Sequence, residues 1–64
     1  STQSNQAVIR LADSYRLINK SDKAEEAYAE VVKIKDIDPV NYYYYAKALI
    51  NNGKRDAAKP WIDK

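Results

Sequence analysis

The chain has 64 residues and a formal net charge of +2, from 11 basic and 9 acidic side chains. This length allows at most one small domain, and a composition of 45% hydrophobic and 31% charged residues argues against a disordered chain. The sequence has no cysteine and no histidine, so it lacks thiolate and imidazole metal ligands and the commonest general base. We therefore expect a protein that is not an enzyme and that holds no metal or cofactor.

The distribution of charge and hydropathy also limits the partners. Basic residues are spread along the chain rather than gathered in a block, so nucleic acid is not an expected partner. No apolar run approaches the roughly 18 residues that a membrane-spanning helix needs, so we expect no direct membrane insertion. The polar start STQSNQ is not a signal peptide.

The first predicted helix covers about residues 5–18. Its apolar side chains recur at the i, i+3, i+4, i+7 spacing of one helix face; they are Val8, Leu11, Ala12, Tyr15 and Ile18. Ser4 is the expected N-cap, and Asn19 can take the left-handed conformation that ends a helix.

The second predicted helix covers about residues 22–35, after Ser21 as its N-cap. Its apolar face consists of Ala24, Ala27, Tyr28, Val31 and Ile34. Because only two or three residues separate the two helices, they are expected to form an antiparallel hairpin.

The sequence DIDP separates this helix from a third one. Asp38 can accept hydrogen bonds from free helix N–H groups, and Pro39 suits the first helical position. The third apolar face is Tyr42, Tyr45, Ala46 and Leu49, and Gly53 is the expected C-terminal cap.

A fourth helix is expected to begin near Asp56, with the chain stopping within it. If Asp56 is the N-cap, Pro60 falls at the edge of the first turn, where a proline does little damage; the alternative is a kinked helix. The sequence thus predicts an all-α fold of three full helices and part of a fourth.

Aligning the sequence with itself at an offset of 34 residues pairs large side chains with large ones, small side chains with small ones, and turn residues with turn residues. The pairs are Val8 with Tyr42, Leu11 with Tyr45, Ala12 with Ala46, Tyr15 with Leu49, Asn19 with Gly53, Lys20 with Lys54, Asp22 with Asp56, Ala24 with Ala58 and Tyr28 with Ile62. A helix-turn-helix period of about 34 residues is typical of the tetratricopeptide repeat.

The residues resemble that family over positions 5 to 64. The resemblance implies antiparallel hairpins stacked in an α-α superhelix, with one repeat at about 5–38 and a partial repeat at about 39–64 of a single domain. It implies a repeat core of Leu11, Ala12, Tyr15, Ala24, Tyr28, Tyr42, Tyr45, Ala46, Leu49 and Ala58. Asn19 for the usual turn glycine and Val8 for the first aromatic residue depart from the pattern.

A narrower resemblance concerns the segments ADSYRLINKSDKAEEAYAEVVKI and YYYYAKALINNGKRDAAKPWIDK. They are similar to the N-terminal repeat segment of Bacteroidetes OmpA-like outer-membrane proteins. This resemblance implies a fragment of a larger protein that is associated with the periplasm or outer membrane. Without it, a cytoplasmic location is the expectation.

Four consecutive tyrosines, Tyr42 to Tyr45, point in four directions on a helix, so they cannot all be core. In the resembled family, the groove that receives a peptide or helix is lined by the positions of Ile9, Asp13, Arg16, Tyr43, Lys47 and Ile50. For Tyr43, a contact with a partner and a partly buried ring with a solvent-exposed hydroxyl are equally expected. Tyr44 is the weaker candidate for a partner contact.

Acid/base catalysis and the binding of a C-terminal carboxylate find less support in the sequence. The carboxylates Glu25, Glu26 and Glu30 alternate with lysines at helical spacing, which favours a solvated face over an acid/base cluster. The positions at which some family members clamp a C-terminal carboxylate are mostly uncharged here. Trp61 is expected to pack in the core, against whatever follows it or against another copy of the chain.

Two functions remain open. The first is a protein-protein interaction module that binds a protein, peptide or helix in its groove. The second is a structural element whose copies form a homo-oligomer by stacking or exchanging their terminal helices, because fewer than two repeats leave the stacking faces uncovered.

Overall fold

The computed structural model describes residues 2–64, and they form four helices and no strand. In chain order these are α1 (Thr2–Leu17), α2 (Ser21–Val31), α3 (Val40–Asn51) and α4 (Arg55–Ile62). The predicted all-α fold is confirmed. None of the helices in the described part of the chain is long and apolar enough to cross a membrane.

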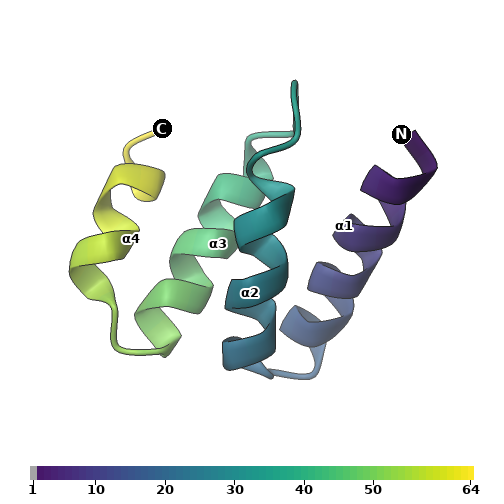
Figure 1. The fold of residues 1–64 in the computed structure, drawn as a ribbon. Coiled ribbons are helices and arrows are strands. Elements are labelled where there is room, and N and C mark those ends of the chain that lie inside the picture. Colours follow the sequence, from purple (N-terminus) through teal and green to yellow (C-terminus); the bar gives the residue numbers. More distant parts are fainter. Residues whose placement is uncertain (1) are drawn as a thin grey trace.

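The helices lie side by side in a single row, and each runs antiparallel to the one before it (Figure 1). Each helix packs on its neighbours in the sequence. The molecule measures 32 × 25 × 14 Å, and its shortest dimension is little more than the diameter of one helix, about 10–12 Å. The described helices therefore form a single layer.

The turn between α1 and α2 closes by a pair of backbone hydrogen bonds. Asn19 has a φ of 62°, in the left-handed region that was expected of it. Its N–H donates to the carbonyl of Arg16 at 3.1 Å, and the next N–H, from Lys20, donates to the carbonyl of Tyr15 at 3.0 Å. This pattern is the Schellman motif, which satisfies carbonyls at the end of a helix.

The turn between α3 and α4 repeats these bonds 34 residues later. Gly53, with a φ of 78°, donates to Ile50 at 2.9 Å, and Lys54 donates to Leu49 at 2.8 Å. Both turns also continue in the same way, because the fourth residue after Lys20 and after Lys54 donates back to that lysine's carbonyl. The two hairpins therefore have the same backbone at their turns.

The helix starts differ from the expected caps. α1 already includes Thr2, so Ser4 lies within it rather than capping it; no proline or glycine in this segment stops the helix. Ser21 is the first residue of α2 rather than its N-cap, a position held by Lys20 without a side-chain cap bond. At α3 the Asp38 carboxylate accepts, as expected, from the N–H of Val40 at 3.0 Å. Pro39 is the N-cap of this helix rather than its first residue, so that part of the prediction is wrong.

α2 ends at Val31, four residues before the predicted end. After Val31 the backbone N–H groups of Lys33 and Ile34 donate to carbonyls three residues back instead of four, which is the 3₁₀ pattern. Asp36 then has a φ of 59°, so the chain does not return to a helical path after this end. The run VVKI keeps a helical apolar spacing, but its β-branched residues favour a helix only weakly.

α4 begins at Arg55, so the prediction that Asp56 is its N-cap is wrong. Pro60 consequently lies in the second turn of the helix rather than at the edge of the first. It has no N–H to offer the carbonyl four residues back, but the helix continues to Ile62, and Asp63 donates to Lys59 at 3.2 Å.

The core consists of two clusters of buried residues. One joins the first hairpin to α3 and contains Ala12, Ala24, Ala27, Tyr28, Val31 and Ala48. The other lies in the second hairpin and contains Ala46, Leu49 and Ala58. Tyr45 packs against both clusters and so links the hairpins.

Most of the predicted core positions are buried or half-buried. Tyr15, Tyr42 and Tyr45 are half-buried. Leu11 is the exception, because its side chain is 48% exposed. Its equivalent, Tyr45, is covered by the first hairpin, whereas no described residue precedes α1 to cover Leu11. The prediction that Leu11 belongs to the core is therefore wrong for this part of the chain.

Candidate functional site

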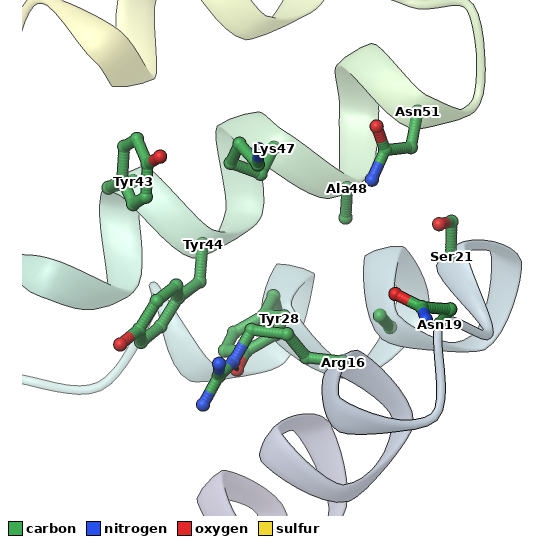
Figure 2. A pocket seen from close by; sticks show the side chains of 10 residues that line it. Arg16, Asn19, Ser21, Tyr28, Tyr43, Tyr44, Lys47, Ala48 and Asn51 are labelled. Carbon is green, nitrogen blue, oxygen red and sulfur yellow. Dashed lines mark hydrogen bonds between the residues drawn. The ribbon is translucent and has the colours of Figure 1, made fainter.

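A pocket of about 360 Å³ lies where α1, α2 and α3 meet (Figure 2). We call it the tyrosine pocket. Its lining residues are Arg16, Asn19, Ser21, Ala24, Tyr28, Tyr43, Tyr44, Lys47, Ala48 and Asn51. They come from the end of α1, from the turn that follows it, from α2 and from one side of α3.

The wall contributed by α3 follows from helical spacing. Tyr43, Lys47 and Asn51 are four residues apart and lie in one row along the helix, and Tyr44 and Ala48 form the adjacent row. Ala48 is the smallest side chain of the two rows, so space opens between α3 and α2 at its position. The wall thus combines two aromatic rings, one ammonium group and one amide.

Arg16 is held in place by contacts to three residues. Its Nε donates to the hydroxyl of Tyr28 at 2.9 Å, and its guanidinium carbon lies 4.0 Å from the centre of the Tyr44 ring. Asp13, three residues earlier, is 3.6 Å from its terminal nitrogen. The hydrogen bond to Tyr28 raises the pKa of Arg16, so this side chain is a fixed positive charge.

Tyr28 forms the floor of the pocket and is fully buried. Its hydroxyl donates to Oδ1 of Asp13 at 2.5 Å while accepting from Arg16. Burial, and then the bond to Asp13, raises the pKa of Tyr28 well above its ordinary value. The phenol therefore stays neutral and connects the acid behind the pocket to the cation at its edge.

The open side of the pocket is more exposed. The Tyr43 ring is 54% exposed and lies 6.0 Å from the Tyr44 ring, centre to centre. Lys47 is exposed and makes no ion pair within residues 2–64. The lining thus carries two cations and no carboxylate. Because Arg16 is paired with Asp13 behind the pocket, the uncompensated positive charge at the pocket is that of Lys47.

Three of the six predicted groove residues line this pocket, namely Arg16, Tyr43 and Lys47. Asp13 lies behind Arg16 and supports it. Ile9 and Ile50 do not line the pocket. Ile9 packs against the cluster of the first hairpin, and Ile50 packs against that of the second.

Sequence reasoning ranked Tyr44 below Tyr43 and missed the other pocket residues, which are Asn19, Ser21, Ala24, Tyr28, Ala48 and Asn51. The signal was present in part, because Tyr44 and Ala48 are four residues apart on α3. The contact between Tyr28 and Tyr44, whose ring centres are 5.8 Å apart, depends on how α2 meets α3. Helical spacing within one element does not predict such a contact.

The described residues contain no group of three or more histidine, cysteine, aspartate or glutamate side chains that could hold a metal ion. What the pocket offers is recognition chemistry: aromatic faces, amide groups and fixed positive charge. The expectation that the chain is not an enzyme stays a prediction.

Comparisons with protein-family models, with curated proteins and with solved structures found no match. The resemblances to tetratricopeptide repeats and to OmpA-like proteins therefore depend on the residues of this chain alone.

Proposed function

We propose that this chain is a protein-protein interaction module of the tetratricopeptide type, and that the tyrosine pocket receives a side chain of a bound peptide or helix. The observation that carries the proposal is the lining, which has two cations, two accessible tyrosines and no carboxylate. Aromatic and arginine side chains are the residues that most often dominate binding energy at protein interfaces.

The order of the pocket supports binding. Arg16 is fixed by Tyr28, Tyr44 and Asp13 before any partner arrives. A side chain that is already ordered loses little conformational entropy on binding, and that loss is about 0.5–1.5 kcal/mol for each side chain that must be immobilised. The pocket therefore resembles a preformed site.

The polar end of the pocket adds hydrogen-bonding capacity. Asn19, Ser21 and Asn51 lie together at the turn end of the pocket (Figure 2). Amide and hydroxyl side chains both donate and accept, so they suit the backbone of an extended or helical segment. The positive charge at Arg16 and Lys47 favours a segment that carries acidic residues.

The repeat assignment has its own support. The two turns form the same hydrogen bonds 34 residues apart, and the paired small residues are buried in both hairpins, Ala12 with Ala46 and Ala24 with Ala58. An origin in an OmpA-like protein of the periplasm or outer membrane is the narrower form of the proposal, and it depends on the two sequence segments quoted above.

A displayed library of random peptides, selected against the whole chain, tests the binding function. We expect selected peptides to be rich in acidic residues and to perturb the amide resonances of Tyr43, Tyr44 and Lys47. Lys47→Glu should weaken the binding of these peptides at least about tenfold, because it replaces attraction by repulsion at the site.

Lys35→Glu is the matched control, since it makes the same charge change at an exposed lysine between α2 and α3 that lies outside the pocket. Peptides that bind Lys47→Glu and Lys35→Glu equally, or a selection that yields no binder, would overturn the proposal.

A second candidate, self-assembly, is favoured by the apolar side chains that are exposed at the two ends of the row. Leu17 is 71% exposed and Ile18 is 60% exposed at the end of α1, and Ile62 is 54% exposed on α4. Stacking of copies end to end would cover these side chains, and sedimentation across a range of concentrations tests it.

A further inference from the structure

A second, shallower groove lies between α1 and α2 and shares no residue with the tyrosine pocket. We call it the Leu11 groove. It has a volume of about 260 Å³ and is lined by Val8, Leu11, Tyr15, Lys23, Glu26, Ala27 and Glu30. Four of these side chains are apolar, and three charged ones stand along the α2 side.

The second hairpin shows what fills the same place. The residues 34 positions after Val8, Leu11 and Ala27 are Tyr42, Tyr45 and Trp61. The indole of Trp61 lies against both tyrosines, with ring centres 5.7 Å from Tyr42 and 5.0 Å from Tyr45. In that hairpin an aromatic side chain therefore occupies the space between the two helices.

The comparison is one of matched backbones, because both turns form the same hydrogen bonds and the helix boundaries Leu17 and Ser21 recur as Asn51 and Arg55. The side chain at the filling position differs. Ala27 stands where the second hairpin has Trp61, so the Leu11 groove is open because its own sequence supplies only a methyl group.

The charged side chains at equivalent positions of the two hairpins indicate what would lie beside an aromatic side chain in the Leu11 groove. In the second hairpin Lys64 follows Trp61, and its ammonium lies 5.4 Å from the centre of the indole ring and 5.9 Å from that of Tyr42. The position equivalent to Lys64 is Glu30. Together with Glu26 and Lys23, it gives the groove a lining of two carboxylates and one ammonium. Both carboxylates are exposed and already have a lysine beside them, Lys23 at 3.8 Å from Glu26 and Lys33 at 3.1 Å from Glu30.

We propose that the Leu11 groove is a second binding site, which receives a tryptophan side chain of a protein partner, with a basic residue of that partner beside it. The indole lies between Val8 and Leu11 over Ala27, as Trp61 lies against Tyr42 and Tyr45. The partner's cation is attracted by Glu26 and Glu30, in competition with Lys23 and Lys33, which pair with them in the free chain. This site is independent of the tyrosine pocket, so either site can fail its test without the other.

The probes are three small molecules: N-acetyl-tryptophanamide and the acetylated dipeptide amides Lys-Trp and Glu-Trp. Each is titrated into the whole 64-residue chain while its amide resonances are recorded. We expect saturable shifts centred on Val8, Leu11 and Ala27. The Lys-Trp probe should bind about threefold more tightly than the Glu-Trp probe, and added salt should reduce the difference, as for exposed charge pairs.

Two variants decide the result. Leu11→Ser removes one apolar wall at a side chain that is already half exposed, so the fold is retained, and we expect binding to weaken at least about fivefold. Ala27→Trp supplies the side chain from within and should abolish probe binding. Ile62→Ser is the matched control, because it removes an exposed apolar side chain that lies outside the groove.

If Ala27→Trp does not fold, Leu11→Ser and its control still decide. Shifts that centre on Tyr43, Tyr44 and Lys47 would overturn the proposal. So would shifts that rise linearly to the solubility limit of the probe, or binding that Leu11→Ser leaves unchanged.

Discussion

The two hairpins have turns of the same kind but differ in what surrounds their second helix. In the first hairpin Tyr28 on α2 is fully buried, and its hydroxyl is bonded to Asp13 and Arg16. Its equivalent on α4, Ile62, is 54% exposed. The difference arises because α3 covers α2, whereas no described helix covers α4.

The interface between the hairpins also has a polar clasp. The side-chain amide of Asn52 donates to the carbonyl of Ser21 at 2.9 Å and to Glu25 at 2.8 Å. Lys54 donates to the other oxygen of Glu25 at 2.7 Å. The comparison indicates that a hairpin of this kind is stabilised largely by its neighbour, so equivalent substitutions should have unequal effects in the two hairpins.

The largest difference is expected at Tyr28 and Ile62. Tyr28→Ala removes a fully buried ring and leaves Asp13 and Arg16 without their common partner, which should cost about 3–5 kcal/mol. That loss is comparable to the whole stability of a domain of this size, so the variant should be largely unfolded at 25 °C. Ile62→Ala should cost less than about 1 kcal/mol. Urea unfolding followed by circular dichroism measures both, and equal losses would contradict the comparison.

The next effect concerns close contact within the second hairpin. Ala46 is 1% exposed and lies in the cluster with Leu49 and Ala58. Ala46→Leu should therefore overpack the hairpin and destabilise it by about 1–3 kcal/mol. Ala57→Leu makes the same change at an exposed site on α4 and is the control. Thermal unfolding of the two variants at one midpoint would show that this site tolerates a larger side chain.

Local signals in the sequence predicted the number of helices and their turns. Asn19 and Gly53 have the positive φ that their turns need, and the Asp38 carboxylate bonds to the start of α3. The end of α2 was predicted four residues too late, because the apolar spacing continues through Ile34 after the hydrogen-bond ladder has changed.

The remaining differences depend on neighbours in space rather than in sequence. Leu11 is exposed because no described element packs on that side of α1 and because Ala27 leaves open the space that Trp61 fills beside Tyr45. In the tyrosine pocket, Tyr43 and Lys47 were expected from the groove positions of the resembled family. The bridge from Tyr28 to Tyr44 forms only when α2 and α3 pack, so a pattern within either helix does not contain it.

A smaller effect is expected from pH at the clasp. The hydrogen bond from Lys54, helped by the one from Asn52, lowers the pKa of Glu25 from its ordinary value of 4.5. A lowered folded-state pKa stabilises the fold above the unfolded pKa, and this stability is lost as the pH falls through the folded-state pKa. Wild type should therefore lose more stability than Glu25→Gln when urea unfolding is compared at about pH 6 and about pH 3. Equal losses in the two proteins would show that the clasp does not couple folding to protons.

The smallest effect is expected from end-to-end association of copies. If one copy stacked on the next as α2 stacks on α3, Lys59 would take the place of Glu25, and Lys20 would take the place of Lys54. The ion pair of the internal interface would be replaced by two like charges, while Ile62 and Ile18 would still gain apolar contacts. The association should therefore be weak, and it should strengthen as salt screens the lysines. Lys59→Glu should restore an attractive pair and strengthen association at low salt. Sedimentation over a hundredfold range of concentration, at low and at high salt, measures both effects. A chain that remains monomeric in every condition, including the Lys59→Glu variant, would show that the exposed ends of the row do not stack on each other.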